Sequence, residues 1–172
     1  VRLLWIIFSP IKDQGYLNIW GDIWEYSAKY DVDGDDLYKC RLLNQLAFIK
    51  QSLREFDHAL SMHQTALRIG YDLEESAEIA SALHQMSWCY FLTEQLDKAV
   101  KHNAEAIDIF ERFEIENEDY IKALMRKAIF QASSNMVKDA ENSFQNLIDY
   151  LERKNWFSFM PLVYRNIGFF FF

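Results

Sequence analysis

The stretch SALHQMSWCYFLTEQLDKAVKHNAEAI, residues 81–107, decides the fold of this chain. Its apolar residues recur every three or four positions on both sides of a break near Glu94, which predicts two amphipathic helices joined by a short turn. The small residue Ser87 stands within the first predicted helix, and Ala99 stands within the second. Because small side chains let two helix axes approach closely, we expect these two residues to face each other where the helices cross.

The same pattern occurs before and after this stretch. Small residues of the first predicted helices recur at intervals of 40, 41 and 40 positions, and those of the second helices at intervals of 40 and 41. The first series is Ala47, Ser87, Ala128 and Gly168, and the second is Ala59, Ala99 and Ala140. No stretch alternates between polar and apolar residues as a strand would. The sequence therefore predicts an all-α chain of stacked antiparallel helix hairpins.

This repeat resembles the tetratricopeptide repeat, whose signature runs Trp-x2-Leu-Gly-x2-Tyr and then Ala-x3-Phe. The central repeat reads LHQMSWCY at residues 83–90, and the last reads YRNIGFFF at residues 164–171. The period exceeds the usual length of about 34 residues, so the chain resembles a long-repeat branch of that family. The resemblance implies a right-handed superhelical solenoid of helix hairpins.

The predicted breaks divide the chain into repeats at residues 36–72, 73–116 and 117–155, followed by a half repeat at 156–172. Residues 1–35 are expected to form a degenerate N-terminal helical hairpin. Within it, residues 17–25 are similar to a helix that precedes the repeats in bacterial signal-transducing NTPases of the NB-ARC/STAND type. Gly70 is expected to end a helix in the left-handed conformation. Lys50, Lys127 and Gln131 interrupt the apolar pattern and predict weaker packing around them.

Composition argues against several kinds of partner. The formal net charge is −8, whereas a nucleic-acid surface needs a dense basic stripe and an anionic membrane attracts basic segments. We therefore expect no nucleic acid and no membrane as partners. The two cysteines form no framework of disulfides, which favours a reducing, cytoplasmic compartment.

No catalytic pattern stands out in the sequence. The four histidines, at positions 58, 63, 84 and 102, form no HExxH zinc motif and have no cysteine at ligand spacing. A glycine-rich phosphate loop is also absent. We therefore expect a non-catalytic protein with no cofactor and no metal site.

The resemblance implies that the first helices line a concave groove that receives a peptide or a helix. Residues of those helices that point away from the packing alanines are the expected partner contacts. They are Arg41, Asn44, Phe48 and Gln51, then His84, Trp88 and Phe91, then Lys122, Met125 and Ile129, and finally Arg165 and Phe169. Asn44 stands where family members often hold a peptide backbone amide, so Asn44→Ala is expected to weaken binding and to leave the fold intact.

One apolar series follows the small packing residues by one position. It consists of Phe48, Trp88, Ile129 and Phe169. One interpretation makes this aromatic ridge part of the core, which periodic aromatic residues favour. The other makes Trp88, Phe91 and Phe48 anchors for an apolar partner, because tryptophan is enriched in binding hot spots.

The predicted function is protein or peptide binding, as the sensor or scaffold part of a larger bacterial regulatory protein. The alternative is a structural spacer or oligomerisation module whose aromatic ridge is buried against the rest of a parent chain. Residues 169–172 are apolar and are a candidate surface for self-association.

Overall fold

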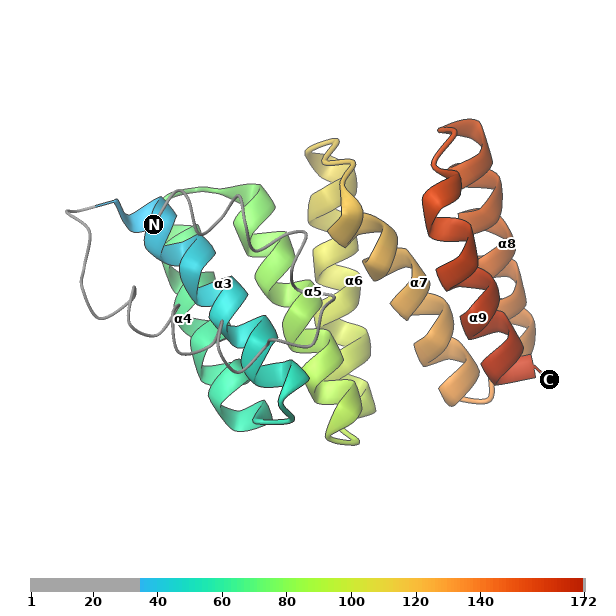
Figure 1. Cartoon of the computed structure of the whole chain (residues 1–172), viewed down its shortest axis with the longest axis horizontal. Coiled ribbons are helices and arrows are strands. Elements are labelled where there is room, and N and C mark those ends of the chain that lie inside the picture. The colour runs from blue at the N-terminus through green and yellow to red at the C-terminus, as the bar shows by residue number, and fades with distance from the viewer. Residues whose placement is uncertain (1–34, 172) are drawn as a thin grey trace.

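The computed structural model describes residues 35–171 (Figure 1). The predicted N-terminal hairpin, apart from Asp35, and the NTPase-like segment 17–25 lie outside these residues. The described residues form α-helices and one short 3-10 helix. In chain order they are α3 (Asp36–Ser52), α4 (Phe56–Asp72), α5 (Ser76–Leu92), α6 (Leu96–Arg112), α7 (Glu118–Ser133), α8 (Val137–Arg153), η2 (Phe157–Phe159) and α9 (Met160–Phe171).

Consecutive helices pack against each other as antiparallel hairpins, α3 with α4, α5 with α6 and α7 with α8. In Figure 1, α3, α5, α7 and α9 stand on the side nearer the viewer, and α4, α6 and α8 stand behind them. No strand occurs between residues 35 and 171. The predicted all-α solenoid of helix hairpins is therefore confirmed. None of the described helices is both long enough and apolar enough to cross a membrane.

Every helix from α3 to α8 ends in the same kind of turn. The residue with positive φ in each turn is Arg54, Glu74, Glu94, Glu114, Asn135 or Asn155. After α5, the N–H of Gln95 donates to the carbonyl oxygen of Tyr90 at 2.8 Å, and the N–H of Glu94 donates to that of Phe91 at 3.1 Å. This pair of bonds is the Schellman motif, which satisfies carbonyl groups at a helix end. The turns recur every 20 or 21 residues, and two of these intervals make the period of the sequence.

The prediction that Gly70 ends a helix is wrong. Gly70 lies inside α4, which continues to Asp72, and Glu74 takes the left-handed conformation instead. A Cβ atom on Gly70 would lie 3.1 Å from Cγ1 of Ile79 on α5. Glycine at this position therefore serves the close approach of α4 to α5.

The small residues of the repeat lie where the helices meet, with one exception. Ala47 and Ala59 pack together with Cys89 in one cluster, and Ala99 and Ala128 belong to the central core cluster. The four alanines are completely buried. Gly168 is the exception and corrects the prediction for α9. It is exposed, and a Cβ atom built on it would meet nothing within 4 Å.

The first helix of the second and of the third hairpin is covered on more sides than the helix that follows it. Helix α5 packs against α3, α4, α6 and α7, and an almost unbroken run from Ile79 to Tyr90 is buried. Helix α6 has five buried residues, and they lie along one face. Because polar residues of α5 cannot all reach water, they must find partners inside the solenoid. These buried polar residues determine the character of the candidate site.

Candidate functional site

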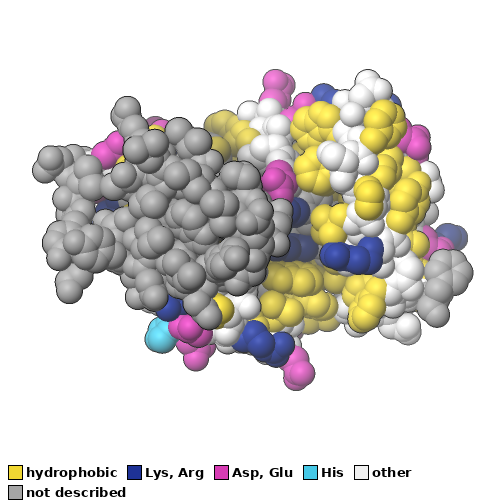
Figure 2. Space-filling view, viewed as in Figure 1, with side chains coloured by type: hydrophobic (Ala, Val, Ile, Leu, Met, Phe, Trp, Pro, Cys, Tyr) yellow, Lys and Arg dark blue, Asp and Glu magenta, His cyan; other side chains and the backbone are white. Residues whose placement is uncertain are grey.

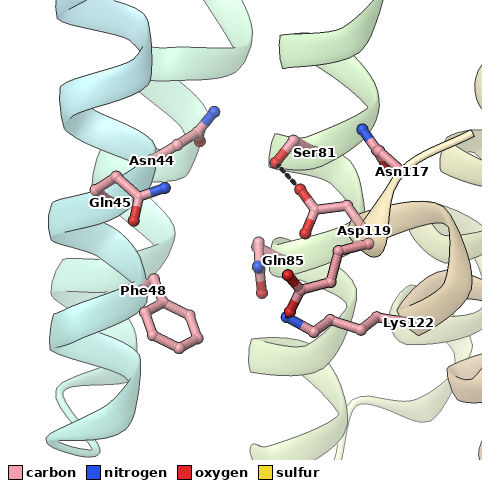
Figure 3. Close-up of a pocket in the computed structure, with 9 residues that line it drawn as sticks. Asn44, Gln45, Phe48, Ser81, Gln85, Asn117, Asp119 and Lys122 are labelled. Carbon is pink, nitrogen blue, oxygen red and sulfur yellow. Dashed lines mark hydrogen bonds and ion pairs between the residues drawn. The ribbon is translucent and has the colours of Figure 1, made fainter. Parts of the chain in front are cut away.

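A cavity of about 260 Å³ lies on the face of the solenoid formed by the first helices. Side chains from α3, α5 and the beginning of α7 line it (Figure 3). They are Asn44, Gln45, Phe48, Ser81, Gln85, Asn117, Glu118, Asp119 and Lys122. Figure 3 shows the α3 residues on one side of the opening and the α5 and α7 residues on the other. We call this space the first-helix cavity.

Hydrogen bonds and charge pairs hold the α5–α7 wall of the first-helix cavity. The hydroxyl of Ser81 donates to Oδ2 of Asp119 at 2.6 Å, and the ammonium group of Lys122 pairs with Glu118 at 2.5 Å. Asn117 caps α7 by accepting a hydrogen bond from the N–H of Tyr120. The wall thus presents polar groups whose positions are set by the start of α7.

Asn44, which lines the cavity, has one side-chain atom without a partner among the described residues. Its Oδ1 lies 3.0 Å from Nδ1 of His63, so a proton on that ring nitrogen is donated to Asn44. Its Nδ2 is buried and makes no hydrogen bond there. A buried amide donor without an acceptor costs free energy.

Three of the predicted contact residues, Asn44, Phe48 and Lys122, line the cavity. Two others lie on the same helices without reaching it. Arg41 is exposed and pairs with Glu78 of α5 at 2.7 Å. Gln51 is buried and accepts a hydrogen bond from the thiol of Cys89 at 3.0 Å.

His84 differs most from its predicted place. It is completely buried, and its backbone oxygen accepts a hydrogen bond of 2.6 Å from Nη1 of Arg126. Burial, together with the nearby Arg126 cation, holds the pKa of His84 well below its usual value. His84 therefore belongs to a polar core between α5 and α7, because α5 is covered on both sides.

The same polar core contains Arg126 itself and His63. Nη2 of Arg126 donates to Oε1 of Gln85 at 3.3 Å, and its guanidinium carbon lies 4.9 Å from the ring centroid of Trp88. Burial lowers the pKa of Arg126 to about 9 and that of His63 to about 3. Both histidines are therefore neutral near pH 7.

The aromatic ridge is divided by the structure. Trp88 and Phe91 are half-buried and stack with ring centroids 5.1 Å apart, and Phe91 also contacts Phe130 at 5.0 Å. Ile129 belongs to the hydrophobic core, whereas Phe169 is 81% exposed. Of the remaining candidates, Met125 is buried and Arg165 is exposed on α9.

Sequence reasoning missed most of the polar residues of the cavity, namely Gln45, Ser81, Gln85, Asn117, Glu118 and Asp119. The sequence repeat contains a signal for two of them, Gln45 and Gln85. Successive first helices carry a polar residue two positions before the small packing residue. These polar residues are Gln45, Gln85, Arg126 and Asn166. Because these positions are one repeat apart, the polar residues form a row along the face of the solenoid that the first helices make.

Among the residues that the structure describes, no group of three histidine, cysteine, aspartate or glutamate side chains is arranged to hold a metal ion. Cys40 and Cys89 are free and buried, and burial raises the pKa of their thiols to about 12 and about 11. These thiols are therefore protonated and poorly reactive near pH 7.

Residues 38–112 match the family model described as tetratricopeptide repeat, so this part of the chain is similar to that family. No curated protein matches the chain.

Solved structures share the fold across nearly the whole chain. The apo form of RapI superposes with a TM-score of 0.73 at 18% identity, over 97% of this chain and 60% of that one. Aspartyl phosphate phosphatase F from Bacillus subtilis gives 0.79 at 11% identity, over 99% and 45%. A Rap protein complexed with competence and sporulation factor gives 0.63 at 19% identity, over 80% and 36%. At these identities the likeness establishes the fold alone, and the chain spans 60% or less of these proteins.

Proposed function

We propose that the first-helix cavity binds an extended peptide segment, and that this chain is a non-catalytic, cytoplasmic sensor or scaffold in a larger bacterial regulatory protein. Helical-repeat folds of this type are typical of protein–protein interaction modules. One of the structural neighbours is a Rap protein complexed with competence and sporulation factor. We also propose that the repeats divide at residues 36–72, 73–116 and 117–155, with a half repeat at 156–172.

The observation that carries the proposal is that Asn44, whose buried Nδ2 has no partner among the described residues, lines the cavity. Gln45 and Gln85 add two more amide groups on facing helices. An amide side chain both donates and accepts, so it matches the alternating N–H and C=O groups of an extended peptide backbone. Phe48 supplies an apolar contact at one end of the same cavity. The candidate contacts outside the cavity remain Arg41, Trp88, Phe91 and Arg165.

Selection of a random peptide library displayed on phage, with the full chain immobilised, tests this proposal. The affinity of an enriched peptide is then measured by calorimetry for the wild type and for Gln45→Ala and Phe48→Ala. Each variant is expected to weaken binding at least about tenfold, which corresponds to about 1.4 kcal/mol. Gln64→Ala, an exposed position on α4, is the matched control and leaves the affinity unchanged. Failure to enrich any peptide, or equal affinity for all variants, would overturn the proposal.

A second candidate function is a spacer or oligomerisation module, and the open face of α9 favours it. Phe169, Tyr164 and Phe157 are 81%, 55% and 57% exposed. Figure 2 shows hydrophobic side chains gathered over the end of the solenoid where α8 and α9 lie. Light scattering over a dilution series tests this candidate, because self-association through residues 169–172 requires a mass that rises with concentration. A constant monomer mass would eliminate it.

A further inference from the structure

A second hollow lies between α6 and α7, away from the first-helix cavity. It has a volume of about 610 Å³, and its walls are mainly apolar. On α6 the lining begins at Leu96 and continues to Glu111, nearly the whole helix. At a rise of 1.5 Å per residue, this stretch is about 22 Å long. We call this hollow the α6–α7 groove.

The preceding repeat shows why the groove is open. Met86 and Leu60 occupy, one repeat earlier, the positions of Lys127 and Val100. Met86 is 3% exposed, and Leu60 packs against the core cluster to which Met86 belongs. Lys127 is exposed, and Val100 is 45% exposed. Between α4 and α5, larger apolar side chains fill the equivalent space. Between α6 and α7, the shorter valine and the charged lysine leave it unfilled.

The apolar walls of the groove are accessible from outside. Val100 and Met136 are 45% and 48% exposed, and Leu96 is half-buried. Leu96, Val100 and Ala104 follow one another at intervals of four residues, so they form one stripe along α6. An open apolar stripe along a helix is a surface on which another amphipathic helix packs.

The rim of the groove is acidic. Asp97, Asp108 and Glu111 line it, and Lys127 is the cation among the lining residues. Asp108 pairs with Arg112, whereas Asp97 and Glu111 form no ion pair within the described part of the chain. A partner that buries apolar residues here must therefore place its own polar flanks against carboxylates.

We propose that the α6–α7 groove is a docking site for an amphipathic helix of a partner protein, with a leucine-type apolar face flanked by lysine or arginine. The apolar face packs on Leu96, Val100 and Ala104, and the basic flanks lie beside Asp97 and Glu111. This site is separate from the first-helix cavity and does not depend on a peptide in that cavity.

The probe for this site is the fluorescein-labelled peptide LKKLLKLLKKLLKL, whose leucines form one face of a helix. Its binding to the full chain is measured by fluorescence anisotropy at about 0.15 M NaCl, where exposed charges are partly screened. The peptide LEELLELLEELLEL, with the same apolar face and the opposite charge, is the matched probe. The structure predicts saturable binding of the basic peptide and at least about tenfold weaker binding of the acidic one.

Two substitutions locate the site. Ala104→Trp fills the groove without changing its charge and is expected to weaken binding of the basic peptide at least about tenfold. Gln64→Trp, at the equivalent exposed position of α4, is the control and leaves binding unchanged. Asp97→Asn is expected to weaken binding about two- to fivefold, as for other exposed charge pairs.

Lys127→Met distinguishes the effect of shape from that of charge. The variant makes the rim more acidic, but it also introduces the residue type that fills the space between α4 and α5. Weaker binding of the basic peptide therefore supports the groove, and stronger binding indicates a purely electrostatic surface. The proposal is overturned if Ala104→Trp binds the peptide as well as the wild type does, or if both peptides bind equally. It is also overturned if the wild type sediments as a dimer that Ala104→Trp dissociates, because a second copy then occupies the groove.

Discussion

Nη1 of Arg126 on α7 donates a hydrogen bond of 2.6 Å to the backbone oxygen of His84 on α5. Arg126 is only 7% exposed, and its guanidinium group also lies over the ring of Trp88. A long polar side chain of one hairpin thus completes the interior of the preceding hairpin. Arg126 therefore has a structural role at the junction of the second and third hairpins.

Replacing Arg126 tests that role. Arg126→Ala is expected to lower the free energy of unfolding by about 2–4 kcal/mol, because it creates a cavity and removes the buried hydrogen bonds that Arg126 donates to His84 and Gln85. Arg126→Met fills most of the volume and is expected to cost less. Urea denaturation followed by circular dichroism measures both. Equal stability of Arg126→Ala and the wild type would contradict the buried contact.

Acid is expected to destabilise the fold through the buried histidines. The pKa of His63 is lowered to about 3 and that of His84 well below 6.5, so both are neutral in the folded chain but bind protons in the unfolded chain below pH 6.5. The stability is therefore complete above that pH and falls as the pH is lowered toward 3. Between pH 7.5 and 5.5, each histidine contributes a loss of about 1.4 kcal/mol.

Denaturation midpoints at the two pH values check this dependence. His63→Gln is expected to reduce the difference between them, and His58→Gln, at an exposed position, serves as its control. A stability that is the same at both pH values would show that the histidines are not held neutral.

Ala99 tests the register of the repeat. It is completely buried in the central core cluster beside Ala128 and Met86, so Ala99→Leu is expected to cost about 1–3 kcal/mol by overpacking. Ala104→Leu, on the exposed side of the same helix, should change the stability by less than about 0.5 kcal/mol. Thermal melting of the two variants distinguishes them, and similar melting temperatures would argue against the register.

Glu94 lies in the left-handed region, with a φ of 61°. This conformation is costly for a residue with a Cβ atom, and glycine adopts it freely. Glu94→Gly is therefore expected to raise the stability by about 0.5–1 kcal/mol, whereas Lys101→Gly inside α6 is expected to lower it by about 1 kcal/mol. Chemical denaturation of both variants gives the comparison. A loss of stability in Glu94→Gly would count against the Schellman turn.

The structure changes the expectation that Asn44→Ala leaves the fold intact. Because its Oδ1 is paired with His63 in the interior, Asn44→Ala leaves a buried ring nitrogen without its partner. The variant should lose about 1–3 kcal/mol of stability as well as affinity. Gln45→Ala, at a half-buried position, is expected to be nearly neutral for folding. A melting curve of Asn44→Ala identical to the wild type would restore the original expectation.

The all-α class and the phase of the repeat could be read from the sequence because they depend on local spacing. Apolar residues at three- and four-residue intervals predict helices wherever they occur, and Ala47, Ser87 and Ala128 mark the same position in successive hairpins. The expected partner contacts were harder to assign, because exposure depends on how many helices cover each face. His84 was expected at the surface and is buried, whereas Gln45 and Gln85 were passed over and line the cavity.

By itself, then, the sequence determined the helices and the period that joins them, since hydrogen bonding and amphipathic spacing act within a few residues along the chain. Only the tertiary structure decided where neighbouring hairpins fail to fill the space between them. The α6–α7 groove depends on Val100 of α6 and Lys127 of α7, which both line it. Gly168 is open because none of the described helices lies against it. Such features come from the packing of distant side chains, which no local pattern contains.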